Sequence, residues 1–186
     1  MDVKEAIDTR RAYRSLEKVK ITKNIIEDFS ECARLSASCF NNQPWKYIFV
    51  YDEEKLRKMH EALSSGNEWA KKASMIIVVL GKKDEDCVIY DRIYYRFDIG
   101  LATQNIILRA TELKLVAHPI AGYSPKKTRE ILGIPEDLDV ITLVIVGKHS
   151  KKINDFLSDK QKKAEKKRPE RKKIEDFVFY NSYGGQ

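Results

Sequence analysis

Two uninterrupted apolar runs constrain the fold of this chain more than any other feature. The runs "ASMIIVVLG" (residues 73–81) and "DVITLVIVG" (residues 139–147) are rich in β-branched residues and too short for buried helices. Successive side chains of a strand point to opposite faces, so a strand that is apolar throughout must be covered on both faces. We therefore expect an α+β fold in three α/β/α layers, with a mixed, mainly antiparallel sheet between helices.

The other segments supply the expected helices and outer strands. Residues 21–38 place apolar side chains four positions apart and have Thr22 as an N-cap. Residues 124–134 place Ser124 before Pro125 and end at Gly133, which is typical of a capped helix. The longest helical pattern covers residues 88–115 and is apolar over much of its circumference, so it needs burial in a core or against a second subunit. Further helices are expected at 2–11 and 52–65, and strands at 45–51 and 116–123.

Positive charge is concentrated near the end of the chain. The 186 residues carry a formal charge of +7 and are expected to form a single domain, 1–186. Residues 148–173 hold 12 Lys and Arg against four Asp and Glu, whereas the rest of the chain holds 23 against 24. We interpret this stretch as a solvated linker. The aromatic segment 174–185 that follows is expected to dock as an edge strand or on a partner subunit.

The cysteines and histidines exclude some classes of chemistry. Cys32, Cys39 and Cys87 form no C-x-x-C and leave one cysteine unpaired, so we expect no disulfide framework and a reducing compartment. We interpret Cys39 as a small pocket residue rather than a redox thiol. The three histidines form no metal-binding motif, and no metal site is predicted. No bilayer-spanning run or signal peptide is apparent, so a cytoplasmic location is expected, without a membrane partner.

Three arginines lie within five positions in "RRAYR", residues 10–14. A run of like charge is often a solvated face or a nucleic-acid patch. A tight group of guanidinium groups also suits a doubly charged anion such as a phosphate, which arginine binds bidentately. The sequence has no G-x-G-x-x-G and no Walker lysine loop, so a bound phosphate would have to be held by side chains such as these.

A second polar stretch, "SCFNNQPWKYIFV" (residues 38–50), places three side-chain amides directly before Pro44 and a strand. Amides offer donors and acceptors together, which suits the edge of a heterocycle with alternating carbonyl and ring nitrogen groups. The alternative is an ordinary loop whose amides cap its own backbone.

Six segments in this order resemble the nitroreductase family of FMN-dependent oxidoreductases. They are "RRAYR", "SCFNNQPWKYIFV", "DIGLATQNIILRATELKL", "HPIAGY", "ILGIPEDLDVITLVIVG" and "RPERKKIEDFVFYN". The resemblance covers nearly the whole chain. It implies a homodimer with FMN at the interface, a long central helix at that interface and a C-terminal arm, residues 148–186, that wraps the partner.

The resemblance also implies the cofactor-binding residues, while no side chain is assigned a catalytic role. Phosphate and ribityl contacts would come from Arg10, Arg11, Ala12, Arg14 and Arg171. Isoalloxazine and ribityl contacts would come from Ser38, Cys39, Asn41 and Gln43, with Asn67 as a further contact. The flavin edge would be lined by Pro119, Ile120, Ala121 and Gly122.

The function implied is hydride transfer from NAD(P)H to a tightly bound FMN, followed by reduction of nitroaromatic, quinone or similar small acceptors in a ping-pong mechanism. Two alternatives use the same residues differently. The basic segment 148–173 could bind nucleic acid, although it lacks the interleaved aromatic residues that stack on bases. The protein could also store or sense flavin without turnover.

Overall fold

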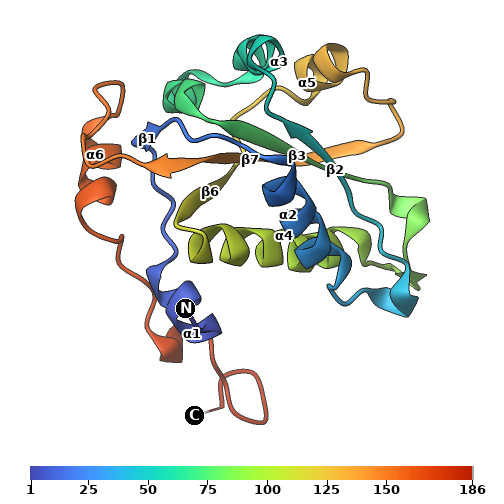
Figure 1. Ribbon diagram of the computed structural model, residues 1–186. Coiled ribbons are helices and arrows are strands. Elements are labelled where there is room, and N and C mark those ends of the chain that lie inside the picture. Colours follow the sequence, from blue (N-terminus) through green and yellow to red (C-terminus); the bar gives the residue numbers. More distant parts are fainter. Residues whose placement is uncertain (186) are drawn as a thin grey trace.

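The computed structural model describes residues 1–185 and is built around a five-stranded sheet (Figure 1). Its two central strands, β3 (Met75–Gly81) and β7 (Asp139–His149), pair with each other. Outside them lie β2 (Lys46–Val50), paired with β3, and β6 (Leu115–Ile120), paired with β7. The short strand β1 (Leu16–Glu17) pairs with the end of β7. Every one of these pairings is antiparallel.

Both faces of the central strands are covered, as the apolar runs predict. Alternate residues of β3 enter two separate core clusters, with Ile76, Val78 and Leu80 in one and Met75, Ile77 and Val79 in the other. All six are at most 3% exposed. The prediction of a sheet between two apolar layers is confirmed.

Helices supply the outer layers (Figure 1). The helices α3 (Glu53–Met59) and α5 (Pro125–Leu132) lie on one face of the sheet, and α2 (Lys23–Arg34) and α4 (Tyr95–Glu112) on the other. The helix α1 (Val3–Thr9) packs near α4. Short 3-10 helices occur at Cys39–Asn41, His60–Ala62, Ser65–Lys72, Lys83–Glu85 and Ile174–Asp176. The α+β class is confirmed.

The helix caps follow the sequence signals closely. The side chain of Thr22 accepts a hydrogen bond from the backbone N–H of Ile25, and that of Ser124 accepts one from Lys127. Gly133 ends α5 with φ of 65°, a left-handed conformation that glycine adopts without a steric penalty. Both helix starts predicted from the sequence are confirmed.

Two expected helices are shorter than their patterns. The pattern over 88–115 was expected to be one helix, but α4 begins only at Tyr95. Residues before it form a hairpin of β4 (Val88–Ile89) and β5 (Arg92–Ile93), turning at Tyr90, whose φ is 59°. The expected helix over 52–65 ends at Met59 and continues as 3-10 turns.

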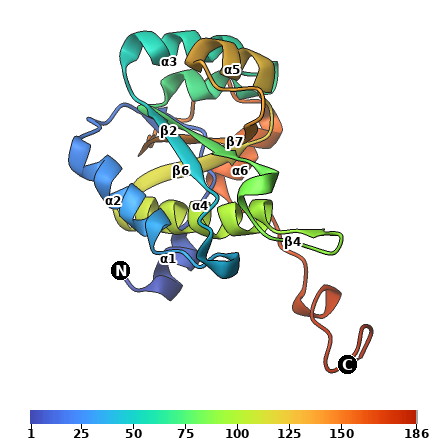
Figure 2. The same cartoon turned by 90° about the vertical axis from the view of Figure 1, so that its right-hand side faces the viewer.

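The basic segment contains structure that its composition does not predict. The helix α6 (Asp159–Lys166) begins with a capping box, in which Ser158 and Gln161 bond each other's backbone. The segment 174–185 forms no strand but extends away from the layers (Figure 2), with Phe177 and Tyr183 exposed. The expectation of an edge strand here is wrong within this chain. Among the described residues, no helix has the length and apolar character to cross a bilayer.

Candidate functional site

An arginine-lined cavity of about 300 Å³ lies between the N-terminal segment and α6. It brings together residues from both ends of the chain. Its lining consists of Arg10, Arg11, Ala12, Arg14, Lys160, Gln161, Ala164, Arg168, Pro169 and Arg171. All five phosphate contacts implied by the sequence therefore meet at one place.

The arginines of this cavity form no ion pair with the described residues, although the charge of Glu165 acts on Arg14. The arginines that form ion pairs within residues 1–185 are Arg34, Arg96 and Arg109, none of which lines the cavity. Burial lowers the pKa of Arg10, and the neighbouring charges of Arg168, Arg171 and Arg11 lower it further. Burial likewise lowers the pKa of Arg14. Such a group of partly desolvated cations is stabilised by an anion.

The buried carboxylate of Glu165 organises the backbone of the cavity. It accepts hydrogen bonds from the backbone N–H groups of Arg14, at 2.7 Å, and Ser15, at 3.1 Å. In the other direction, the guanidinium of Arg11 donates to the carbonyl of Ala164, and that of Arg168 donates to the carbonyl of Arg10. These bonds join the segment around α6 to the N-terminal segment and so hold the two walls of the cavity together.

Asn67 and Gly122, both predicted flavin contacts, bond each other beside this cavity. The side-chain amide of Asn67 donates to the carbonyl of Gly122 at 2.8 Å and accepts from the indole N–H of Trp69 at 3.1 Å. A Cβ at Gly122 would lie 2.4 Å from the Asn67 amide nitrogen, so a larger residue at this position would displace the Asn67 side chain. The guanidinium of Arg14 lies 5.9 Å from the Trp69 ring, which connects this pair to the arginines.

The stretch 119–122 and its neighbour His118 border the same region. Pro119 and Ala121 are exposed, whereas Ile120 is buried in the core. The imidazole of His118 stacks on Trp69 at 4.8 Å, and its Nδ1 lies 3.1 Å from the carbonyl oxygen of Tyr13. Burial, with added repulsion from Arg14 and Arg10, lowers the pKa of His118 to about 4. The ring is therefore neutral at pH 7.

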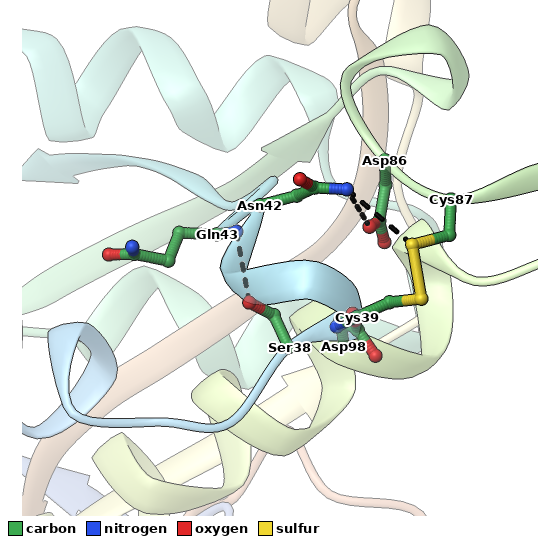
Figure 3. The surroundings of a disulfide bond; sticks show 7 residues. All are labelled: Ser38, Cys39, Asn42, Gln43, Asp86, Cys87 and Asp98. Carbon is green, nitrogen blue, oxygen red and sulfur yellow. Dashed lines mark hydrogen bonds between the residues drawn. A yellow bond between two sulfur atoms is a disulfide. The ribbon is translucent and has the colours of Figure 1, made fainter.

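The amide loop, residues 38–43, has an unusual backbone. Phe40, Asn41 and Gln43 have φ values of 47°, 61° and 51°, a region that residues other than glycine rarely occupy. The Ser38 hydroxyl accepts from the backbone N–H of Gln43 at 3.0 Å, and the N–H of Cys39 donates to Asp98 of α4 at 2.6 Å. Figure 3 shows the Gln43 side chain pointing away from Cys39.

A disulfide joins Cys39 to Cys87, and Cys32 is free (Figure 3). This single bond is a disulfide where none was predicted, and the interpretation of Cys39 as a small pocket residue is wrong, although one cysteine does stay unpaired as expected. The two Cα atoms are 6.1 Å apart because the segment before the β4–β5 hairpin folds back over the amide loop. Cysteines 48 positions apart with no motif give no sequence signal for this pairing.

The amide loop and the arginine cavity lie near opposite ends of α4 within one chain. Cys39 bonds Asp98 in the first turns of the helix, whereas Arg11 and Tyr13 line a hollow with Thr111 and Lys114 at its other end. Thirteen residues of helix separate the two points by about 20 Å. The structure therefore does not bring Ser38, Asn41 and Gln43 to the arginines of the same chain.

Sequence reasoning missed several residues of the cavity. Arg168, Lys160 and Gln161 line it, and Glu165 holds its backbone. All four lie in the segment interpreted as a solvated linker. The Ser158–Gln161 capping box was the signal for a helix there. Within residues 1–185, no cluster of three or more His, Cys, Asp or Glu residues could hold a metal ion.

Comparisons with known proteins identify the family of this chain. The family model described as "Nitroreductase family" matches residues 7–74 and 64–148. An Archaeoglobus fulgidus protein with the name "Putative NADH dehydrogenase/NAD(P)H nitroreductase" is 36% identical over 145 residues, which is 76% of this chain and 82% of that protein.

Two solved structures share the fold over nearly the whole chain. A nitroreductase family protein from Clostridium difficile 630 is 24% identical, with a TM-score of 0.80 over 98% of this chain and 99% of the other. A structure described as an oxidoreductase containing FMN is 25% identical, with a TM-score of 0.83 over 100% of this chain and 94% of the other. By the family match, by identity to a relative and by fold, this chain belongs to the nitroreductase family.

Proposed function

We propose that the protein is an FMN-dependent oxidoreductase that takes hydride from NAD(P)H and reduces small acceptors. The observation that carries this proposal is the cavity in which five arginines gather, none of which forms an ion pair within residues 1–185. Family membership supports it, as do the relative named for NAD(P)H nitroreductase activity and the similar structure described as containing FMN.

The residues present fit the phosphate of FMN. A phosphomonoester carries nearly two negative charges and several acceptor oxygens, and arginine donates to such oxygens in a bidentate geometry. Arg10 and Arg14 are partly desolvated, so their interaction with an anion is stronger than at an exposed surface. Arg11, Arg168 and Arg171 would supply further contacts to the phosphate, and Ala12 would line the wall of the cavity.

The proposed FMN site needs two chains. Because the amide loop lies about 20 Å from the arginines along α4, the loop over one isoalloxazine would come from the partner subunit. A hollow of about 380 Å³ between α1, α2 and α4 offers a face for that partner, with Val3, Leu35 and Leu108 among its lining. Within the arm 148–186, the part beyond Arg171 would then cover the partner with its exposed aromatic residues, in a single domain 1–186.

The chain would bind and orient the cofactor rather than donate a catalytic side chain. When bound, FMN supplies the hydride acceptor and passes electrons to nitroaromatic, quinone or similar acceptors in a ping-pong cycle. Neutral His118 holds Tyr13 and Trp69, so the positive charge that stabilises a negative ring comes from the arginines. Backbone near Ala121 and Gly122 would face the flavin edge, fixed by Asn67.

The test is the visible spectrum of the purified protein, with mass identification of any released chromophore. FMN at one molecule per chain, bleached by NADH or NADPH and reoxidised by a quinone or nitroaromatic, is the expected result. A protein that is colourless and takes up no added FMN would refute the proposal. FMN bound without oxidation of either nucleotide would instead indicate a flavin store or sensor.

A further inference from the structure

We propose that Cys39 and Cys87 form a reversible thiol–disulfide exchange site for low-molecular-weight thiols, whose oxidation state controls the geometry of the amide loop. The exchange itself is independent of the proposed function. Only its consequence for flavin binding rests on that function, because the loop carries the predicted contacts Ser38, Asn41 and Gln43.

The disulfide is the covalent restraint on a loop whose backbone is unfavourable unless its surroundings hold it. Phe40, Asn41 and Gln43 all have positive φ, and each such residue costs free energy unless the surroundings hold it in place. The remaining restraints are hydrogen bonds, among them those from Cys39 N–H to Asp98, from Gln43 N–H to Ser38 and from the Asn42 side chain to Asp86. Cleaving the covalent restraint should therefore let the loop relax.

The surroundings of the two sulfur atoms favour attack at Cys39 and departure of Cys87. Cys39 is half-buried, whereas Cys87 is 8% exposed, so an attacking thiolate reaches the Sγ atom of Cys39 more easily. The amide of Asn42 lies 3.5 Å from the Sγ atom of Cys87 and donates to it (Figure 3). A donor at that position stabilises Cys87 as the leaving thiolate.

A buried carboxyl group, Asp98, lies beside the disulfide and accepts a hydrogen bond from the backbone N–H of Cys39. Asp98 is 2% exposed, and burial raises its pKa, with a further rise from the adjacent Asp86. The Oδ2 atom of Asp86 is buried and has no hydrogen-bond partner among the described residues. Asp98, which is hydrogen-bonded to the backbone of Cys39, is therefore the carboxyl group near the disulfide that favours its protonated form.

The exchange balances with two thiol molecules as the reductant. A thiolate attacks the Sγ atom of Cys39, forming a mixed disulfide while the Cys39–Cys87 bond breaks and Cys87 takes up a proton. A second thiolate attacks the outer sulfur of the mixed disulfide and releases Cys39, which is also protonated. The products are two protein thiols and one external disulfide, and the reverse sequence restores the bond.

The test uses the full-length protein with Cys32→Ser, which leaves only the two cysteines of the site. The protein is equilibrated with mixtures of reduced and oxidised dithiothreitol, then alkylated and weighed by mass spectrometry, while circular dichroism monitors the fold. We expect a single reversible transition between zero and two alkylated cysteines in the folded protein. A bond that resists reduction until the protein unfolds, or thiols that never re-form it, would overturn the proposal.

The conformation of the amide loop is measured separately, by the rate of chymotryptic cleavage after Phe40, a residue that is 84% exposed. Cleavage should be at least about tenfold faster in the reduced form, since about 1.4 kcal/mol of released restraint is a factor of ten. The matched control, Cys32→Ser with Cys39→Ser, should be cleaved at the fast rate whether or not dithiothreitol is present. Equal rates in both redox states would overturn control of the loop.

FMN affinity separates this inference from the proposed function. We expect the dissociation constant for FMN of the Cys32→Ser protein to rise by about tenfold when the disulfide is reduced. The dissociation constant of the control, Cys32→Ser with Cys39→Ser, should be the same with and without dithiothreitol. If neither redox form bound FMN, the proposed function would fail, while the alkylation transition and the cleavage rates would still decide the exchange site.

Discussion

The carboxylate of Glu165 accepts a hydrogen bond of 2.7 Å from the backbone N–H of Arg14, although 151 positions separate the two residues. A second bond from the N–H of Ser15 makes the same carboxylate a two-point anchor. Because that carboxylate is occupied by backbone donors, it holds the arginine segment in place without forming an ion pair with its guanidinium groups. The cavity keeps its positive charge for a ligand.

Glu165→Ala should lower the free energy of unfolding by about 2–5 kcal/mol, because it leaves two backbone donors without charged acceptors and the N–H of Ser15 is buried. Urea denaturation measures the change. Glu165→Gln keeps one acceptor oxygen and should lose less. The exposed Glu170 is the control, and a Glu165→Ala variant as stable as Glu170→Ala would contradict the anchoring role.

Arg14→Ala combined with Arg171→Ala should weaken FMN binding by at least about 100-fold while the chain stays folded. Each guanidinium contact to a phosphate contributes about 1.5–3 kcal/mol, so two losses exceed that factor. Fluorescence titration with FMN measures the affinity. Lys23→Ala with Arg34→Ala removes the same charge from the surface of α2 and should leave the affinity unchanged. Stoichiometric flavin retained by the cavity double variant would show that the phosphate lies elsewhere.

Stability should fall as the pH drops from about 6.5 to about 4 because of His118. Burial lowers the pKa of this residue to about 4 in the folded protein, whereas an unfolded histidine titrates near 6.5. The unfolded state therefore binds the proton first. The contribution of neutral His118 to the free energy of unfolding is fully present above pH 6.5 and is lost by pH 4. The maximum loss is about 3 kcal/mol.

Two measurements check this pH dependence. The His118 ring, followed by NMR, should titrate near pH 4. Thermal unfolding between pH 7 and 4 should show a steeper loss of stability than in a His118→Phe variant, which keeps an aromatic ring over Trp69 but has no titrating group. A ring that titrates near 6.5 in the folded protein would rule out this assignment.

Gly122→Ala should displace Asn67, because the added methyl group would lie 2.4 Å from its amide nitrogen. We expect a stability loss of about 1–3 kcal/mol from the overpacked contact. If 119–122 borders the flavin, the variant should also shift the visible spectrum of bound FMN. Gly66→Ala meets nothing within 4 Å and is the matched control. A Gly122→Ala protein as stable as Gly66→Ala would show that the Asn67 side chain moves aside without a cost in stability.

The sequence predicts the elements whose signals are local. The runs at 75–81 and 139–147 become the strands β3 and β7, which are buried on both faces. A strand with apolar side chains on both faces is stable only when both faces are covered. The helix α5 begins and ends at its predicted caps, since Ser124 and Gly133 act on their own backbone. The arginines 10, 11, 14 and 171 meet as the family resemblance implies, although this could not be worked out from their spacing.

What the sequence does not predict depends on contacts between distant residues. The Cys39–Cys87 bond joins segments 48 positions apart, and neither cysteine lies in a motif. Glu165 is buried by accepting backbone hydrogen bonds, whereas hydrophobic periodicity detects only apolar burial. The hairpin before α4 shares its apolar and aromatic composition with the helix, so the pattern over 88–115 cannot separate them.

The pairing of the chain's two ends also sets the order in which the molecule can be completed. β1 pairs with Lys148 and His149, and the cavity needs Arg168 and Arg171 together with Arg10. A nascent chain that has emerged from the ribosome only to residue 150 already contains α2, α3, α4 and α5 and all five strands of the sheet. It still lacks Arg168 and Arg171, so the arginine cavity is incomplete. An anion held by these arginines can therefore bind only after residue 171 has been synthesised.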